Sequence, residues 1–513
     1  MDTPALRTRT DSGKKIVILL SLIILLGTAL RLFRLGSNSL WFDETVSITM
    51  TKIMADVPCI PQPPLYIFLL HQWSKVAGEN EFALRFLSLI FGVLSIPAIY
   101  VLGKLLFHAQ TGLIAALILS ISPLHVWYAQ EVREYSMLPF FIMACAYFFI
   151  RALNENKRSL WAGFVITAAL SLYINYFAFF IIVTTGIFFF FKPYRPLIKG
   201  WAASCLALFV LYSPRVIAFV KHLAWVNNSF WIPKPSLGSI RLTIENFSLG
   251  YNAVPLSYFL GLLVFLFLFL AGSLRGKENK QSLMISLVFL SFPLLSSWLI
   301  SQRIPIYLDR QNMAVSPFYY ILVAHGLAAL GRKKWPAILL GASVIVLPAL
   351  SLNNYYKNYM PGGYLNKHSI GVSPKKDFRE MAGYLKQNLR DGDALIFAHP
   401  GIEIPAQYYF NYHYPVPAYY LVNHAEEDPY FRKVIQLYES NSKLKDRITV
   451  PVIDVARGFN EPRFRRLWLI VSSWLRTGEL EDNSLAIRNW MGERHRKIDT
   501  KEFDGILVEL YEN

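Results

Sequence analysis

The sequence predicts an α-helical polytopic membrane protein with about eleven transmembrane helices and a C-terminal soluble α/β domain. Its 513 residues are 54% hydrophobic and only 17% charged, and the mean hydropathy is +0.35. Apolar residues form runs of about 17 to 21, which as helices cross about 30 Å of hydrocarbon. Such runs must be helical because the bilayer offers no partner to a free backbone amide. After residue 352 the runs end and short strand and helix patterns alternate.

The spans follow one another through the first 352 residues. The first, Ile16–Leu32, follows basic residues and has no A-x-A-like cleavage site, so we expect a retained helix rather than a cleaved signal. Two later spans are joined only by Asn175 and Tyr176 and form a tight hairpin. The expected spans lie near residues 15–33, 83–106, 111–128, 137–151, 160–175, 177–191, 200–219, 255–274, 281–300, 313–330 and 336–352.

The distribution of charge predicts the orientation in the membrane. Lys and Arg concentrate in alternate short loops, such as 151–158 and 192–199, and acidic residues lean to the other side. The positive-inside rule then places the N-terminus in the cytoplasm. An odd number of spans places residues 353–513 outside, as an extracytoplasmic α/β domain. Residues 1–352 form the membrane domain, with an outer loop at 34–82 that carries juxtamembrane helices. The expected location is the inner or plasma membrane of the cell.

The net charge of +17 does not indicate a nucleic-acid partner. Residues 1–352 hold 29 Lys and Arg against 13 Asp and Glu, whereas the remainder holds 22 against 21. The excess therefore belongs to the membrane loops. The three cysteines form no CxxC pair, and two of them lie inside apolar runs, which is typical of small core residues rather than of a zinc site or a disulfide.

The C-terminal region reads as a small α/β domain. We expect helices at Lys375–Leu389, Glu403–Phe410 and Leu485–Met491, and strands at Ala394–Ala398, Leu467–Ser472 and Gly505–Leu510. The region contains no GxGxxG, P-loop, GxSxG or HExxH motif, so we assign it no chemistry of its own.

The first candidate for chemistry is Trp41-Phe42-Asp43-Glu44, directly after the first span. In one interpretation Trp41 is an interfacial anchor and Asp43 caps a surface helix over Glu44–Met54. In the other, a carboxylate at the membrane surface acts as general base on an incoming hydroxyl.

Two further patches face the same side. Pro61-Gln62-Pro63-Pro64-Leu65-Tyr66 by itself is a turn into an amphipathic helix. At the outer end of the third span, Arg133 either reaches a lipid headgroup or holds a phosphate through paired N–H donors. Arg310 is a second arginine in the loop that follows Gln302 and Arg303. An acid and two arginines on one membrane face predict a site for a phosphate-bearing lipid. The third patch reads Gln130-Glu131-Val132-Arg133-Glu134-Tyr135.

These residues resemble the motifs of the GT-C class of integral membrane glycosyltransferases. The likeness is to the glycosyltransferase family 39-like group, related to protein O-mannosyltransferases and to the lipid A aminoarabinose transferase. Gln62 stands where the family usually has histidine, and Gln311 where it has an aromatic residue. The matching positions are Trp41, Asp43 and Glu44; Gln62 to Tyr66; Glu81 and Arg85; Ser122, Pro123, Tyr128, Gln130, Glu131, Arg133 and Tyr135; and Asp309, Arg310 and Pro317.

The resemblance implies an inverting glycosyltransferase that moves a sugar from a polyprenyl-phosphate donor to a hydroxyl acceptor at the outer face of the membrane. Asp43 is then the catalytic base, with Glu44 second, and Arg133 and Arg310 hold the donor phosphate. The implied substrate pocket comprises Trp41, Gln62, Tyr66, Arg85, Gln130, Glu131 and Tyr135. The phosphate is already a good leaving group, so the acceptor needs a base and the phosphate needs cations.

The sequence does not decide the cofactor, the acceptor or the sugar, and it leaves an alternative function. No ligand cluster demands a metal, although Asp43 and Glu44 could share a divalent ion. The acceptor is a protein, lipid A or another glycan or lipid, and the sugar is a hexose or a pentose. A lipid-linked glycan flippase or other transporter is the alternative, but transporters usually place charges near the midplane in repeated halves. A scaffold without activity is a third reading.

Overall fold

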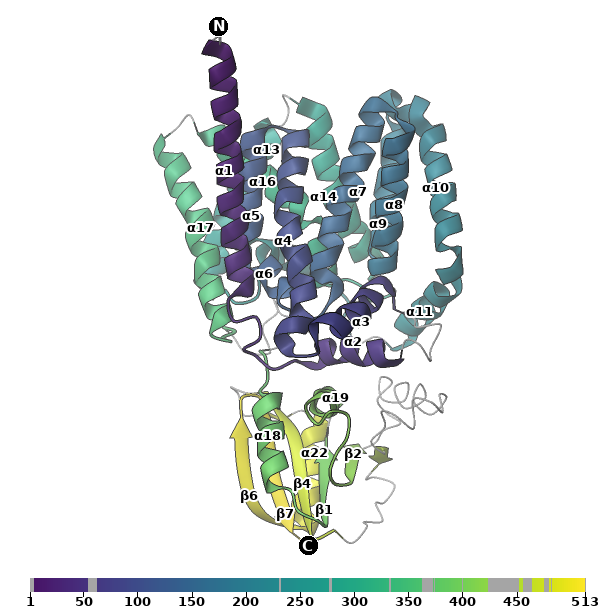
Figure 1. Ribbon diagram of the computed structural model, residues 1–513, viewed down its shortest axis with the longest axis vertical. Coiled ribbons are helices and arrows are strands. Elements are labelled where there is room, and N and C mark those ends of the chain that lie inside the picture. Colours follow the sequence, from purple (N-terminus) through teal and green to yellow (C-terminus); the bar gives the residue numbers. More distant parts are fainter. Residues whose placement is uncertain are drawn as a thin grey trace.

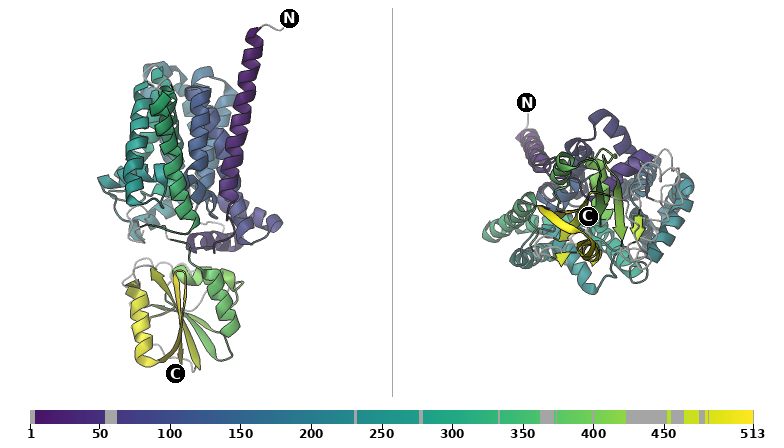
Figure 2. Two further views of the ribbon diagram at one scale, coloured as in Figure 1. Left: turned by 90° about the vertical axis from the view of Figure 1, so that its left-hand side faces the viewer. Right: turned by 90° about the horizontal axis from the view of Figure 1, so that it is seen from below.

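The structure is a computed structural model of the 513-residue chain. A helical bundle and a smaller α/β domain lie end to end, with the N-terminus at the far end of the bundle (Figures 1 and 2). The described residues are 4–53, 62–229, 232–275, 279–331, 334–361, 372, 374–398, 400–422, 452–454, 464–474, 479–480 and 482–512.

The bundle confirms the predicted class, a polytopic helical membrane protein. Within the described residues, eight helices are long and apolar enough to cross a membrane, and a bent pair makes up to nine. Two shorter apolar helices, Arg158–Ile174 and Ala178–Phe190, stand where the hairpin was expected. The count of eleven therefore stays a prediction. The principal helices of the bundle are α1 (Pro4–Leu32), α4 (Glu81–Leu106), α5 (Ala109–Ile121), α7 (Met137–Glu155), α8 (Arg158–Ile174), α9 (Ala178–Ile187), α10 (Ile198–Tyr212), α13 (Pro255–Arg275), α14 (Lys280–Ile300), α16 (Ser316–Leu330) and α17 (Lys334–Tyr356).

The span expected near residues 111–128 is bent. The chain bends by 59° between α5 and α6 (Pro123–Ala129). Ser122 has extended backbone angles, and its hydroxyl accepts a hydrogen bond from the His125 amide, so it caps a new helix. Pro123 supplies the first residue of that helix, where its missing N–H costs nothing. The bend turns the residues after α6 across the end of the bundle.

Small residues allow two central helices to approach closely. A Cβ atom on Gly272 of α13 would lie 2.0 Å from the Leu322 carbonyl oxygen, and one on Gly326 of α16 would lie 2.0 Å from that of Leu268. These glycines therefore permit backbone-to-backbone packing, the usual device for joining helices in lipid.

Short helices cover the end of the bundle that faces the α/β domain. They include α2 (Phe42–Ile53), α3 (Leu65–Ala77), α11 (Val216–Ser229), α12 (Leu237–Leu249) and α15 (Asp309–Asn312). In Figure 1, α2, α3 and α6 lie at this end. All three patches of the sequence belong to it, because they flank α2, α3, α6 and α15.

The α/β domain is a mixed sheet with helices on both faces. The strand order is β3-β2-β1-β4-β7-β6, parallel from β3 to β4 and antiparallel among β4, β7 and β6. Helices α18 and α19 contribute to one hydrophobic cluster and α22 to the other. The bounds are α18 (Phe378–Asn388), β1 (Asp393–Phe397), α19 (Pro400–Tyr409), β2 (Ala418–Val422), β3 (Val452–Asp454), β4 (Arg466–Trp474), β5 (Glu479–Leu480), α22 (Asp482–Arg494), β6 (Arg496–Phe503) and β7 (Ile506–Glu512).

The domain packs directly on the loop that follows α1. The Leu40 amide donates to the Tyr409 hydroxyl at 2.7 Å, and Ser39 donates to Asp377, which caps α18. Arg379 of α18 forms an ion pair with Glu81 at the start of α4. The division predicted at residue 352 stays a prediction, and α17 continues to Tyr356.

Candidate active site

The loop between α1 and α2 is shaped by one buried arginine. Arg85, in the second turn of α4, is 2% exposed. Its Nη1 donates to the carbonyls of Leu35 and Asn38 at 2.9 and 2.8 Å, and its Nη2 donates to that of Ser39 at 3.0 Å. Arg85 thus satisfies carbonyls of a loop that would otherwise be orphaned. The family resemblance placed Arg85 in a substrate pocket, whereas in the structure its side chain lies beneath the loop between α1 and α2.

Glu44 completes this anchor. Its carboxylate accepts two hydrogen bonds from Arg85, both at 2.8 Å, and one from the Val132 amide at 3.1 Å. Burial opposes ionisation, but Arg85 and Lys375 outweigh it and lower the pKa of Glu44 to about 2. The side chain is 0% exposed. A buried carboxylate bound on both oxygens positions the start of α2, and the role of Glu44 as second base stays a prediction.

Asp43 faces the other way. Its side chain is 19% exposed, and its Oδ2 accepts from Nη1 of Arg310 at 2.9 Å. Arg310 lies in α15, which is held by the neighbouring Asp309: the Asn246 amide donates to Asp309 at 2.6 Å, and Thr243 donates to it as well. Residues 267 positions apart in the chain are thus joined at the surface that faces the α/β domain.

Arg133 belongs to the same group. The Arg133 and Arg310 guanidinium carbons lie 5.3 and 5.6 Å from the ring centroid of Tyr135, so one aromatic ring supports both cations. Nη2 of Arg133 donates to the Tyr135 hydroxyl at 3.3 Å and Nη1 to Ser47 at 3.4 Å. These bonds are long for N–H donors. We call Asp43, Arg133, Tyr135 and Arg310 the Asp43 cluster.

The electrostatics of the cluster keep its cations charged. Burial works against the charge of Arg133, but Glu134, Tyr135 and Asp43 together raise the pKa of Arg133 well above its ordinary value. Glu134 forms an ion pair with Arg133 at 3.3 Å. The Nε atom of Arg133 is buried without a hydrogen bond among the described residues. Nε is the atom that lies 3.3 Å from Glu134, so the guanidinium is charged and largely buried and its hydrogen bonds are long, which favours an anionic ligand.

Gln130 ties the loop after α6 to two membrane helices. Its Nε2 donates to the carbonyls of Arg31 and Phe33 at 2.7 and 2.8 Å, and its Oε1 accepts from the Tyr355 hydroxyl at 2.7 Å. All its polar atoms are occupied. We interpret Gln130 as a positioning residue for the loop that carries Arg133.

Lys375, which was not among the predicted site residues, reaches the site from the segment that precedes α18. Nζ of Lys375 lies 2.9 Å from Glu131 Oε1 and 3.4 Å from Glu44 Oε2, and its side chain is only 4% exposed. It also lies 4.9 Å from the ring centroid of Trp41. Lys375 stands before α18, at the first residue of the expected helix Lys375–Leu389. No motif signal marks it.

Glu131 is the buried carboxylate whose negative charge Lys375 compensates. It is fully buried, and its Oε1 also accepts from the Trp127 indole at 2.7 Å. Its Oε2 is buried without a hydrogen bond in the described part of the chain. Burial raises the pKa of Glu131, while Lys375 opposes that rise. Glu44, Glu131 and Lys375 therefore form a buried layer behind the Asp43 cluster, with the half-buried Trp41 beside it.

Tyr66 and Gln62 lie outside the cluster itself. The Tyr66 hydroxyl hydrogen-bonds Ser88 at 2.7 Å, and Ser88 donates to the Arg133 carbonyl at 2.9 Å, so Tyr66 supports Arg133 indirectly. The carbonyl of Gln62 accepts from Arg215 at 2.8 Å, and among the described residues no hydrogen bond joins Gln62 to the cluster.

The carboxylates near Asp43 are candidate metal ligands by residue type. No group of three or more His, Cys, Asp and Glu side chains occurs among the described residues. Glu44 is bound to Arg85 and Asp43 faces Arg310, and a divalent ion shared by Asp43 and Glu44 stays a prediction.

Comparisons with known proteins agree with this fold. The family model described as dolichyl-phosphate-mannose-protein mannosyltransferase matches residues 61–225. That range contains Arg133 but neither Asp43 nor Arg310. An uncharacterized protein of Aquifex aeolicus (strain VF5) is 23% identical over 354 residues, which are 63% of this chain and 67% of that protein.

Two solved structures are similar over most of their length. ArnT from Cupriavidus metallidurans in the apo state has a TM-score of 0.62 at 10% identity, over 98% of both chains. ArnT bound to undecaprenyl phosphate has a TM-score of 0.59 at 11% identity, over 97% of this chain and 98% of that one.

A third similar structure is the archaeal oligosaccharyltransferase AglB of Archaeoglobus fulgidus, in complex with an inhibitory peptide and a dolichol-phosphate. It has a TM-score of 0.52 at 13% identity, over 89% of this chain and 69% of that one. Together these likenesses confirm the resemblance stated from the motifs: the chain has the fold of the GT-C class of polyprenyl-phosphate-sugar-dependent glycosyltransferases.

Proposed function

From this GT-C fold and the Asp43 cluster, we propose that the chain is an inverting glycosyltransferase. It moves a sugar from a polyprenyl-phosphate donor to a hydroxyl acceptor at the outer face of the cell membrane. The observation that carries the proposal is the meeting of a partly exposed carboxylate, Asp43, with two arginines at one end of a membrane-helix bundle. The undecaprenyl phosphate in ArnT and the dolichol-phosphate in AglB support a lipid-phosphate ligand for this fold.

Asp43 acts as the general base. The acceptor oxygen attacks the anomeric carbon of the donor and passes its proton to Asp43, while the bond between that carbon and the phosphate oxygen breaks. Polyprenyl phosphate leaves with the bonding electrons, and in-line attack inverts the anomeric centre. Arg310 orients the Asp43 carboxylate through the 2.9 Å ion pair. Glu44, next in the chain, fixes the start of α2 so that Asp43 stays at the surface.

Arg133 and Arg310 stabilise the charge that develops on the departing phosphate. Each guanidinium offers a planar set of N–H donors, which suits phosphate oxygens. The hydrogen bonds of Arg133, at 3.3 and 3.4 Å, are long and leave donor capacity that a phosphate would use. Tyr135 keeps the two cations at one ring. A pre-organised pair of this kind stabilises a transition state without reorganisation.

The side of the membrane follows from charge. Lys and Arg concentrate in the loops at the far end of the bundle, and the Asp43 cluster lies at the end that packs on the α/β domain. The positive-inside rule then assigns the cluster and the domain to the outer face. An outer active site is consistent with a lipid-bound donor, because charged nucleotide sugars do not cross the bilayer unaided.

The test uses purified full-length protein in lipid nanodiscs with a panel of polyprenyl-phosphate sugars and measures release of polyprenyl phosphate by mass spectrometry. Asp43→Asn should lose about 10²–10⁴-fold in rate, the usual worth of a general base. Asp391→Asn, at an exposed turn of the α/β domain, is the matched control and should keep the rate. Both variants should unfold at the wild-type temperature.

Three outcomes would contradict parts of the proposal. Wild-type rates in Asp43→Asn would remove Asp43 as the base. Movement of the lipid across the bilayer without cleavage would favour a transporter. Labelling of cysteines at Lys75→Cys from the cytoplasmic side, or at Lys199→Cys from outside, would reverse the topology, since both positions are exposed and lie on opposite sides in the proposal.

A further inference from the structure

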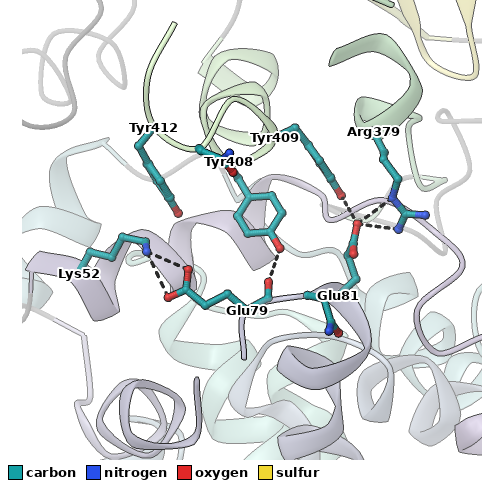
Figure 3. Close-up of a pocket in the computed structure, with 9 residues that line it drawn as sticks. Lys52, Glu79, Glu81, Arg379, Tyr408, Tyr409 and Tyr412 are labelled. Carbon is teal, nitrogen blue, oxygen red and sulfur yellow. Dashed lines mark hydrogen bonds and ion pairs between the residues drawn. The ribbon is translucent and has the colours of Figure 1, made fainter. Parts of the chain in front are cut away.

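A pocket of about 470 Å³ lies between the bundle and the α/β domain, separate from the Asp43 cluster. Its floor comes from the end of α2 and the turn between α3 and α4, and its roof from α18, α19 and the residues after α19 (Figure 3). The volume is within the range of small-molecule sites, about 300–1,000 Å³. No function assigned above uses this pocket.

Three tyrosines form the roof. Figure 3 shows Tyr408, Tyr409 and Tyr412 pointing toward the acidic side chains of the floor. The Tyr409 hydroxyl donates to Glu81 at 3.0 Å, and that of Tyr408 donates to the Glu79 carbonyl. The rings of Tyr408 and Tyr409 therefore keep fixed directions, with their hydroxyl groups on the floor. Rigid aromatic surface of this kind binds a ring-shaped ligand at low entropic cost.

The backbone supports the placement of Tyr412. Asn411 and Tyr412 have φ values of 54° and 59°, in the left-handed region that bulky residues rarely adopt. The Tyr412 amide donates to the Gln407 carbonyl at 2.7 Å, which stabilises this turn after α19. The turn brings the Tyr412 ring to 4.8 Å from Nζ of Lys52 on α2. Such local strain persists where the surrounding structure enforces it, and it is frequent at ligand sites.

The charges of the pocket compensate one another. Lys52 pairs with Glu79 at 3.0 Å, and Arg379 pairs with Glu81 at 2.6 Å. Two cations and two carboxylates leave no excess charge to attract a strong anion or a strong cation. The same side chains, with two neighbouring asparagines, present hydrogen-bond donors and acceptors beside aromatic faces. This combination matches a neutral sugar, whose ring has apolar faces and a rim of hydroxyl groups.

The pocket is linked to Asp43 by one helix. Asp43 is in the first turn of α2 and Lys52 in the last, nine residues apart, which is about 14 Å along the axis. Tyr409 also accepts from the Leu40 amide in the loop just before α2. We infer that this pocket holds the far end of the acceptor, and that the acceptor is a neutral oligosaccharide longer than one ring. The inference rests on the proposed glycosyl transfer and names the acceptor class.

The first experiment measures binding by the full-length Asp43→Asn protein, which retains the pocket without turning over. Lipid nanodiscs replace alkyl maltoside detergents, because the headgroup of those detergents is itself a neutral disaccharide. The probes are mannotriose, maltotriose and chitotriose, their monosaccharides, trigalacturonate as an acidic trisaccharide, and a serine- and threonine-rich peptide. At least one neutral trisaccharide should bind about tenfold or more tightly than its monosaccharide, a difference that calorimetry resolves.

The second experiment tests the place of binding. Tyr412→Ala should weaken that trisaccharide about tenfold and raise the acceptor KM similarly, whereas Tyr412→Phe should stay within about threefold because the ring is kept. Tyr359→Ala, a tyrosine outside the pocket, is the matched control. Unaltered binding in Tyr412→Ala, or preference for trigalacturonate or for the peptide, would overturn the inference. Absence of binding by every neutral trisaccharide would overturn it too. Failure of donor cleavage in the wild type would instead refute the proposed function.

Discussion

Removal of the Lys375 ammonium should expose the energetic role of the layer behind the Asp43 cluster. In Lys375→Met the methylene stem is roughly kept, but Glu131 loses its ion pair at 2.9 Å and Glu44 loses one of its two cations. Glu44 retains Arg85, so the uncompensated charge falls on Glu131, whose remaining partner is the Trp127 indole. Breaking a buried pair by removing one partner costs about 3–5 kcal/mol.

The pH dependence of this loss has a defined sign. Without Lys375 the pKa of Glu131, already raised by burial, rises further above the unfolded value of about 4.3. The folded variant then binds the proton more tightly than the unfolded chain. Its destabilisation should be small below about pH 4.3 and should grow as the pH rises toward the folded pKa, where Glu131 must ionise without a cation.

The assay follows unfolding of the purified full-length variants in nanodiscs by tryptophan fluorescence between pH 4 and pH 8. Lys375→Met/Glu131→Gln removes the buried charge as well and should recover most of the loss, giving a coupling energy of about 1–3 kcal/mol in a double-mutant cycle. Lys386→Met, on the exposed side of α18, is the matched control. A double variant no more stable than Lys375→Met, or a loss that does not change with pH, would refute the reasoning.

Three further predictions concern other parts of the molecule. Arg133→Ala and Arg310→Ala should each raise the donor KM or lower kcat/KM by about 10–100-fold, because a hydrogen bond to a charged group contributes about 1.5–3 kcal/mol. The control Arg303→Ala, in an exposed loop, should change neither quantity. Equal effects at all three positions would count against a phosphate site. Burial raises the pKa of Glu403 in α19 to about 8, so the folded α/β domain loses stability as the pH rises from the unfolded pKa of about 4.3 through 8. Glu403→Gln should therefore raise the unfolding temperature of the domain at pH 9 and change it little at pH 4, and an equal effect at both pH values would show that the carboxyl is not the cause. Gly326→Ala places a methyl group 2.0 Å from the Leu268 carbonyl oxygen and should destabilise the bundle by about 1–3 kcal/mol in thermal unfolding, whereas Gly383→Ala, with open space around it, should not; unchanged stability of Gly326→Ala would mean that α13 and α16 separate at no cost.

The helical membrane fold was predictable because its signal is local. The length and apolar composition of a run such as Glu81–Leu106 predict a membrane helix without information from the rest of the chain. The strand at Asp393–Phe397 and the helix at Phe378–Asn388 were likewise near their expected places. The charged strand Arg496–Phe503 was not expected, because its exposed residues show no apolar alternation and its pairing with β7 stabilises it.

The difference between Asp43 and Glu44 was beyond local reasoning. Both are acids in the first turn of α2. From the sequence, Asp43 could only be ranked before Glu44 as the catalytic base. Arg85, forty-one residues away, draws Glu44 into the interior, and the helical rotation between adjacent residues leaves Asp43 facing Arg310. Lys375 shows the same limit more strongly, since its partners Glu44 and Glu131 are 331 and 244 positions away. Residue types and spans are properties of the chain, whereas burial of a charge depends on which distant group reaches it, and only the folded molecule decides that.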